Sequence, residues 1–387
     1  MNKEIIAKRL LNKIKLVAKR NFKDIHIPDL TSLDSKSVNK TIKKNFVSTY
    51  GPYRQEFEEK LKKITKAKYV LAVNSGTTAL QLAIKSLNLP KNSEILMPSL
   101  TFAASANSAI YNNLKPHFVD TEKNNFGIDF DKLDKYLEKI AKNYSKFIVN
   151  KKTNKQISAI MPVHLFGHSV NCKKLKNIAK KFKLKIIEDA AEALGSKYQN
   201  KHLGIFGDVG CLSFNGNKII TTGAGGALVT NSELIYNRAF YYANIAKKKS
   251  SVDLEHGDVG YNFLMPNLNA SLGISQLNRL NKYVSNKREL YKKYSKEFKS
   301  DKYFKLYKDQ SFEKSNYWLQ TILINEEYKN YKNFFIKYLR NNNIGCRPVW
   351  KCMHMLKPYK NFPRMKLDNT VRHFSSIINI PSSYNIF

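Results

Sequence analysis

Short apolar runs alternate with stretches of helical periodicity over most of the chain. The runs have the length and the polar boundaries typical of buried strands. Strands are predicted over residues 69–73, 94–97, 115–120, 157–162, 184–187 and 208–214. Helices are predicted over residues 34–44, 56–61, 129–142 and 270–281, with another that ends at Ser86. The lysine- and asparagine-rich residues 142–156 read as a polar surface insertion.

Both ends of the chain depart from this pattern. Residues 3–23 predict a basic amphipathic helix, either attached to a membrane surface or docked on the main body or a partner subunit, and docking is favoured. From Ser285 a long charged helix (286–299) precedes short strands at 317–324 and 378–380, with a helix at 331–341 between them. We therefore expect an N-terminal helical extension (1–45), a large domain (46–284) and a small C-terminal domain (285–387).

An acid and a lysine follow two of the predicted strands. Asp189 comes just after the strand 184–187, and Lys218 lies in a glycine-punctuated loop after the strand 208–214. Open α/β sheets place their ligands at the carboxyl ends of such strands. Pyridoxal phosphate (PLP) needs a lysine for its Schiff base and an acid that keeps its pyridine nitrogen protonated. The pair therefore predicts a PLP site with Lys218 as the catalytic residue.

The sequence around the lysine adds a family resemblance. The segment SFNGNKIITTGAGG (213–226) closely resembles the Schiff-base segment of the DegT/DnrJ/EryC1/StrS sugar aminotransferases, and the resemblance extends from Phe46 to Pro381. It implies an α/β protein of PLP-dependent transferase fold type I, as in aspartate aminotransferase. The large domain would then hold a mostly parallel seven-stranded sheet, and the smaller C-terminal domain would be α/β.

The same resemblance assigns cofactor-binding roles. Gly76 and Thr77, in a small-residue turn at a helix N-terminus, would hold the PLP phosphate together with Ser213. Phe102 would lie against the cofactor ring. Glu192 would lie near the phenolic oxygen, where a buried carboxylate must be protonated or engaged by a donor.

Asn262 lies in the segment GYNFLM, which resembles the family's GYNYRM segment. The resemblance implies a homodimer in which this asparagine reaches the PLP phosphate of the neighbouring subunit. Leu264 stands where the family has an arginine, so no cation is expected at that position.

Three further residues are candidates for substrate binding. His164 lies in the family-like string PVHLFG, and Arg347 and His354 belong to an RPVW…H element. Arg347 or His354 would contact the sugar diphosphate or the carboxylate of the amino donor. His164 and His168 stand four residues apart, but no acid or third histidine accompanies them, so no metal site is predicted.

Composition adds constraints but little chemistry. The 387 residues carry 67 Lys and Arg against 30 acids, a net charge of +37, spread along the whole chain. A compositional bias explains this spread, and no nucleic-acid-binding motif accompanies it. Four cysteines without metal-ligand spacing, no apolar run of membrane-spanning length and no signal-like N-terminus predict a cytoplasmic protein.

The resemblance implies transamination of a nucleotide-linked sugar. We expect a UDP- or GDP-linked 4-keto-6-deoxy sugar to become the 4-amino sugar, with L-glutamate as donor and 2-oxoglutarate as product, for surface glycan or lipopolysaccharide biosynthesis. The nearest likeness is to the LegC-type subgroup of nucleotide-sugar 4-aminotransferases. Amination at C3 and PLP-dependent sugar dehydration stay open as alternatives, although Lys218 argues against dehydration.

Overall fold

The protein is built around one large mixed sheet. The computed structural model describes residues 3–20, 22–248 and 255–387. The sheet is nine-stranded, with its main path ordered β1-β11-β10-β7-β6-β2-β3. Its strands are β1 (Tyr69–Val73), β2 (Glu94–Pro98), β3 (Lys115–Val119), β4 (Ala141–Asn143), β5 (Ile148–Asn150), β6 (Lys155–Ile160), β7 (Lys185–Asp189), β10 (Val209–Ser213) and β11 (Gly226–Thr230).

The main path of the sheet is the predicted, mostly parallel one. β10, β7, β6, β2 and β3 pair in parallel, and β11 pairs antiparallel with both β1 and β10. The strands β2 and β11 are buried along their whole length, as expected where helices cover both faces of a parallel sheet. The parallel register sets Cys211 beside Asp189, so the ends of β7 and β10 meet at one edge.

Residues 142–156 lie mostly at the surface, as predicted, but they also form strands that the sequence pattern did not predict. β4 and β5 form an antiparallel hairpin, and β5 pairs with β6 and so extends the sheet. Ile148 is fully buried, and Asn150 is buried against the Glu94 carboxylate through its Nδ2 group, at 3.0 Å from Oε2. Two buried positions among many lysines are too weak a pattern to predict a strand.

Helices surround the sheet, and local signals fix several of their starts. Ser75, Asp129, Asn171 and Ser232 cap four helices by accepting a backbone N–H through their side chains. The helices of this part are α3 (Tyr53–Thr65), α4 (Gly76–Leu87), α5 (Ala103–Tyr111), α6 (Phe130–Ile140), α7 (Cys172–Lys181), α8 (Glu233–Ala243) and α9 (Asn267–Leu277). A short 3-10 turn, η1 (Leu165–Gly167), follows β6.

A second, smaller core lies beside the first. It contains the antiparallel sheet β12-β14-β16-β15, whose strands are β12 (Phe304–Leu306), β14 (Gln320–Ile324), β15 (Arg347–Pro348) and β16 (Ile377–Ile380). The helical elements of this part of the chain are α10 (Leu280–Glu297), α11 (Lys332–Asn341), α12 (Asp368–Ser376), η2 (Glu326–Tyr331) and η3 (Met353–Met355), of which η3 packs on the first core. We call this part the small lobe. A three-stranded sheet of β8 (Lys197–Tyr198), β9 (Lys201–His202) and β13 (Glu313–Lys314) joins it to the large lobe.

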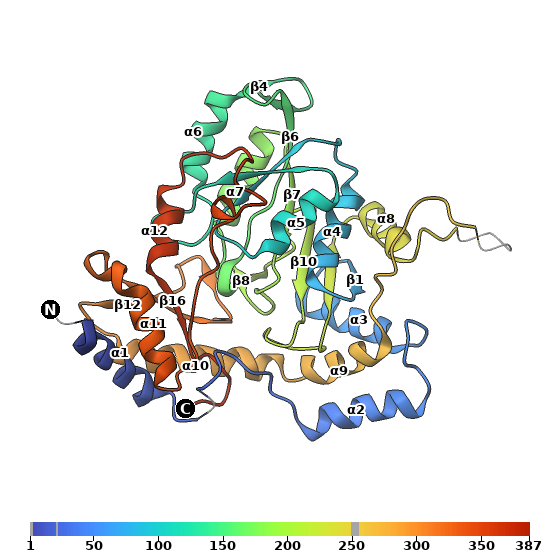
Figure 1. Ribbon diagram of the computed structural model, residues 1–387. Coiled ribbons are helices and arrows are strands. Elements are labelled where there is room, and N and C mark those ends of the chain that lie inside the picture. Colours follow the sequence, from blue (N-terminus) through green and yellow to red (C-terminus); the bar gives the residue numbers. More distant parts are fainter. Residues whose placement is uncertain (1–2, 21, 249–254) are drawn as a thin grey trace.

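The N-terminal helix belongs to the small lobe. α1 (Lys3–Val17) lies beside α10 and α11 near both ends of the chain (Figure 1). Its apolar face, including Ile6, Leu10 and Ile14, is buried in the second core, which confirms docking on the protein body. The helix is shorter than the predicted 3–23. α2 (Ser32–Lys43) packs instead on α9 of the large lobe. The boundaries of the three expected domains stay a prediction.

Within the described residues, no helix is both long and apolar enough to cross a membrane. The four cysteines are all buried and unpaired.

Candidate active site

A cavity of about 320 Å³ opens where β7 and β10 end. Loops of the large lobe and three side chains of the small lobe enclose it. Its walls are formed by Ser75, Gly76, Thr77, Leu80, Thr101, Phe102, Ala104, Val163, Asp189, Ala191, Glu192, Ser213, Asn215, Asn217, Lys218, Ala224, Gly225, Trp318, Arg347 and Trp350. Residues from seven separate parts of the sequence thus meet in one place, and most of those predicted for the cofactor are among them.

Lys218 lies in the loop between β10 and β11, and its side chain is largely buried. Its Nζ atom donates to Glu192 Oε1 at 3.3 Å. The same nitrogen lies 3.9 Å from the centre of the Trp318 ring, within the range of a cation–π contact. The amine is therefore held between a carboxylate and an aromatic face, at a wall of the cavity.

Glu192 is buried beside this lysine. Its Oε2 atom accepts the backbone N–H of Phe166 at 2.7 Å, and Oε1 accepts from Lys218. Phe166 has a positive φ of 56°, a conformation that directs its N–H to the carboxylate. Burial raises the pKa of Glu192, while Lys218 and the Phe166 N–H oppose that rise. The carboxyl is therefore engaged by donors, as its predicted position requires.

Asp189 is the last residue of β7 and lines the cavity floor. Its carboxylate accepts from two neutral donors, the Ser105 hydroxyl at 2.6 Å and the Ala191 N–H at 3.2 Å. Burial raises its pKa, and those hydrogen bonds and the Lys218 charge act in the opposite direction. A buried carboxylate with neutral partners provides a strong acceptor for a cationic ligand group.

The N-terminus of α4 forms another wall. Ser75 caps the helix by accepting the Thr78 N–H at 3.1 Å, so the first-turn residues Gly76 and Thr77 face the cavity. A Cβ atom at Gly76 would lie 2.8 Å from the Ser213 Cβ, so only glycine permits this close approach. Backbone N–H groups without intrahelical partners, a helix dipole and a hydroxyl together suit a phosphate group.

Aromatic rings cover the remaining sides. Phe102 is 53% exposed and lies 5.6 Å, centre to centre, from Trp350. Its predicted contact with a cofactor ring stays a prediction. Trp318 is nearly fully buried, and its Nε1–H donates to the Asn217 carbonyl at 2.6 Å. The sequence analysis did not single out Trp318, although it is one of only two tryptophans in the chain.

Of the three predicted substrate residues, only Arg347 lines the cavity. Its Nη2 atom is buried without a hydrogen-bond partner, and its guanidinium carbon lies 5.7 Å and 5.8 Å from the Trp318 and Trp350 ring centres. Burial lowers the pKa of this guanidinium, and the Glu192 carboxylate opposes that effect. An unpaired buried donor that faces a cavity indicates a site for an anionic ligand group.

The other two predicted substrate residues do not line this cavity. His164 is fully buried, with Nε2 3.0 Å from Glu188 Oε2 and Nδ1 accepting the Val170 N–H at 3.4 Å. His354 lines a different surface hollow, and its Nδ1 lies 2.7 Å from the Ser99 hydroxyl. The PVHLFG motif marks the right strand end, but its histidine side chain points into the core.

Asn262 does not line the cavity of its own subunit. Its side chain is exposed, and its backbone carbonyl accepts from Asn74 Nδ2 at 3.4 Å. Leu264, at the family's arginine position, is mostly buried next to β1. Among the described residues, no cluster of three or more metal-ligating side chains occurs, and His168 contacts Glu313 of the small lobe.

The residues that line the cavity fit PLP. Lys218 supplies the amine, Asp189 an acceptor for a protonated ring nitrogen, and the start of α4 with Ser213 a phosphate cradle that a Cβ at position 76 would fill. The acid, the amine and the cradle lie on different elements around one cavity, which is the arrangement that the cofactor needs.

Comparison with known proteins agrees with this geometry. The model of the DegT/DnrJ/EryC1/StrS aminotransferase family matches residues 28–386. A GDP-perosamine synthase from Escherichia coli O157:H7 is 33% identical over 87% of this chain and 86% of its own. A UDP-4-amino-4,6-dideoxy-N-acetyl-beta-L-altrosamine transaminase from Campylobacter jejuni is also 33% identical, with the same coverage.

The fold has a close match among solved structures. Helicobacter pylori PseC, an aminotransferase involved in the biosynthesis of pseudoaminic acid, superimposes with a TM-score of 0.85 at 26% identity, and the match covers 94% of each chain. The chain therefore belongs to the DegT/DnrJ/EryC1/StrS aminotransferase family, whose members work with pyridoxal phosphate.

Proposed function

We propose that this protein transfers an amino group from L-glutamate to C4 of a 4-keto-6-deoxy sugar linked to UDP or GDP. The observation that carries the proposal is the convergence of Lys218, Asp189 and the unpaired Arg347 guanidinium on one cavity. An amine, a ring-nitrogen acceptor and a free anion-binding group are what a transaminase for an anionic substrate needs.

Each cavity residue has a defined part in such a reaction. PLP, when bound, supplies an electron sink that stabilises negative charge on the carbon next to the reacting nitrogen. Asp189 holds the ring nitrogen protonated through its carboxylate. The Lys218 amine would take a proton from the donor carbon and later return one to the sugar carbon, because its side chain reaches the cavity wall. Glu192, 3.3 Å away, orients that amine.

The substrate class rests on Arg347 and on the relatives. A guanidinium with an unpaired Nη2 binds phosphate or carboxylate oxygens well. Both 33%-identical relatives carry names of GDP- or UDP-linked sugars, and one is called a transaminase of a 4-amino-4,6-dideoxy sugar. These names support a nucleotide-linked keto sugar and favour C4 over C3. The LegC-type subgroup stays a prediction.

Two further parts of the proposal concern assembly and location. We propose a homodimer in which Asn262 completes the phosphate site of the neighbouring subunit, since its side chain is exposed and lies outside its own cavity. Cytoplasmic action is proposed because sugar nucleotides are made there and the four cysteines are unpaired. The product would feed the biosynthesis of surface glycans or lipopolysaccharide.

The test traces the amino nitrogen from L-glutamate to the sugar product. The purified protein with PLP is given ¹⁵N-labelled L-glutamate and a panel of UDP- and GDP-linked 4-keto-6-deoxy sugars. We expect glutamate to bleach the PLP absorbance, one sugar to restore it, and ¹⁵N to appear at C4 in the product NMR spectrum. Lys218→Ala is the matched control and should lose both the lysine-linked absorbance and turnover.

The alternatives give different results in the same experiment. Label at C3 would replace the proposed position, and loss of oxygen from the sugar without label would indicate the dehydratase. A PLP band that glutamate leaves unchanged would refute the donor. Turnover by Lys218→Ala at the wild-type rate would refute the catalytic role of the lysine.

A further inference from the structure

One wall of the active site belongs to a segment that leaves the small lobe and lies on the large lobe. We call residues 307–319, between β12 and β14, the arm. β13 within the arm pairs antiparallel with β8 of the large lobe. Trp318 lies near the end of the arm, and its ring contacts Lys218. Both lobes therefore determine where the arm lies, and the position of the arm in turn determines what surrounds Lys218.

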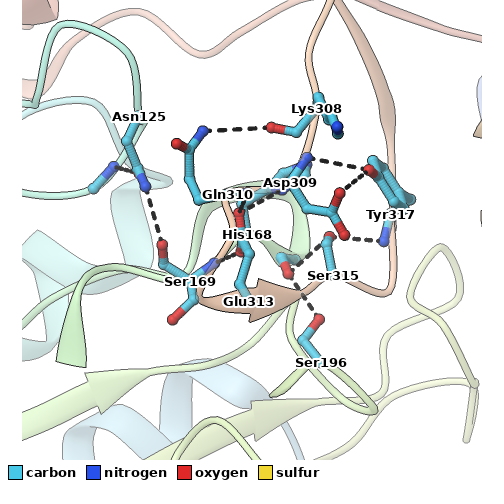
Figure 2. Close-up of polar contacts among 12 residues, drawn as sticks. Asn125, His168, Ser169, Ser196, Lys308, Asp309, Gln310, Glu313, Ser315 and Tyr317 are labelled. Atoms are coloured by element: carbon cyan, nitrogen blue, oxygen red, sulfur yellow. Dashed lines mark hydrogen bonds and ion pairs between the residues drawn. The ribbon is translucent and has the colours of Figure 1, made fainter. Parts of the chain in front are cut away.

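A cluster of buried polar contacts fastens the first half of the arm to the loop after β6. The Glu313 carboxylate accepts from the backbone N–H of Ser169 and of Gln310, and it lies 3.4 Å from His168 Nδ1 (Figure 2). The Glu313 and His168 side chains are each about 1% exposed. A carboxylate buried in this way must keep its donors, so the arm is fixed at this point.

The second half of the arm is fastened by hydroxyl groups. Ser196 and Ser315 both donate to the Gly167 carbonyl, at 2.7 Å and 3.0 Å. Ser196 in turn accepts the Asn316 N–H at 2.9 Å. Figure 2 shows these serines facing each other from the two lobes. The next side chain along the arm, Asn316, is fully buried and has no contact with solvent.

Asn316 connects two opposite walls of the active site. Its Nδ2 group donates to the carbonyls of Glu192 and Leu194, both at 2.9 Å. Its Oδ1 atom accepts the Trp318 N–H at 2.8 Å. Every polar atom of the amide is thus used, and one side chain holds the backbone of both residues that contact the Lys218 amine. A Cβ at Gly167 would lie 1.9 Å from Oδ1, so the fit is close.

We propose that Asn316 is the positioning residue that sets Glu192 and Trp318 on either side of the Lys218 amine. Asn316 does not line the cavity itself, so it acts through these two residues and not on the substrate. The inference rests on the proposed function only in that Lys218 is the residue that moves protons. Because the amide comes from the small lobe, the geometry of the lysine depends on how that lobe is seated.

The test uses one isosteric change and one truncation. Asn316→Asp turns a donor into an acceptor that faces two carbonyl oxygens, whereas Asn316→Ala removes all three hydrogen bonds without adding charge. The matched control is Asn379→Asp, in the small lobe, where the residue is 1% exposed and its Oδ1 atom accepts only the Thr321 hydroxyl, at 2.8 Å. This control measures what a buried charge in the same lobe costs in general stability.

The first readout is tryptophan emission. The chain has two tryptophans, Trp318 and Trp350, and both line the cavity. In a Trp350→Phe background, all tryptophan emission comes from Trp318, which is 1% exposed. We expect both Asn316 variants of the PLP-free protein to show red-shifted emission and severalfold stronger quenching by acrylamide. Asn379→Asp should keep the emission of the parent.

The second readout is the rate, measured with both native tryptophans present. A misplaced reacting group lowers kcat by about 10- to 100-fold, while KM changes little because Asn316 does not touch the substrate. Equal emission and equal kcat in Asn316→Ala and the parent would overturn the proposal. The proposal would also be overturned if Asn379→Asp lost as much kcat, and changed its emission as much, as an Asn316 variant with the same drop in thermal stability. If Asn316→Asp does not fold, Asn316→Ala decides alone.

The two hypotheses fail separately. The emission experiment needs neither glutamate nor sugar, so it tests the position of Trp318 even if the proposed substrate is wrong. Conversely, a wild-type enzyme that aminates the proposed sugar while Asn316→Ala keeps its emission and kcat would leave the function intact and refute the positioning role.

Discussion

Ser105 contacts Asp189, the acid proposed to hold the cofactor's ring nitrogen, and removing the Ser105 hydroxyl gives the sharpest test of the site. The Ser105 hydroxyl donates to Asp189 Oδ2 at 2.6 Å, and it lies 2.8 Å from the Thr101 hydroxyl. All of these groups are buried, so water cannot replace the lost donor in Ser105→Ala. The remaining donor to the carboxylate is the Ala191 N–H at 3.2 Å.

The size of the effect follows from the kind of hydrogen bond. A hydrogen bond to a charged group contributes about 1.5–3 kcal/mol, which corresponds to a change of about 10- to 150-fold in an equilibrium constant. Burial already raises the pKa of Asp189, and loss of the Ser105 donor raises it further because only the ionised form gains from that bond. The ionised carboxylate then becomes scarcer as the pH approaches the pKa of Asp189, and PLP affinity falls there by up to that factor.

The raised pKa of Asp189 also sets the direction in which the pH profile of kcat moves. A raised pKa means that Asp189 takes up its proton at a higher pH, so the acid side of the kcat profile moves to higher pH in Ser105→Ala. PLP titration of the cofactor-free protein and single-turnover bleaching by L-glutamate across pH measure both effects. Ser108→Ala is the control. Ser108 lies on the same helix and is as deeply buried as Ser105, but its hydroxyl donates to the Ser105 backbone carbonyl at 2.8 Å and not to Asp189. Identical PLP affinity and pH profiles in the two variants would refute the reasoning.

Three further changes test other parts of the site. Gly76→Ala should lower PLP affinity at least 10-fold by crowding the phosphate cradle, whereas Gly216→Ala, whose new Cβ would have no neighbour within 4 Å, should not. Arg347→Lys should raise KM for the anionic substrate by about 10-fold with kcat retained, measured by steady-state kinetics, because a lysine loses the paired donors. Burial raises the pKa of Glu188, but the hydrogen bond and charge of His164 outweigh that effect and hold the pKa below its usual range. The ionised carboxylate therefore stabilises the fold fully above the normal glutamate pKa, and this stabilisation is lost as the pH falls through the lowered pKa. Glu188→Gln should therefore cost about 1–3 kcal/mol of unfolding free energy in a urea titration near neutral pH, with the gap from wild type narrowing in acid.

Sequence motifs predicted the parts of the site that lie on short, local structures. Asp189 ends one strand and Lys218 follows another, so the predicted strand ends brought this pair together. Gly76 begins a capped helix, and its role was predicted by resemblance to the family. Glu192 stands three residues beyond Asp189 and was found by resemblance to the family. Each of these positions depends on contacts within a few residues or on the order of the strands, which hydrophobic patterning specifies well.

The parts that the sequence did not predict depend on contacts across long stretches of chain. Trp318 reaches Lys218 from the small lobe, and Asn316 holds Glu192 across 124 positions. His164 turned out to be a core residue because Glu188, on the neighbouring strand, accepts its hydrogen bond. Side-chain direction at a strand end is decided by such partners, and a motif of the correct letters does not specify them.

The charges that line the cavity differ from the charge of the chain as a whole. The cavity is lined by two acids, Asp189 and Glu192, and two cations, Lys218 and Arg347, so its formal charges balance within a protein of +37. The surplus therefore lies outside the site. Charges on the surface are screened beyond about 8–10 Å at physiological salt. They can speed the arrival of an anionic sugar nucleotide, but we expect binding and proton transfer inside the cavity to depend on the two acids and two cations that line it.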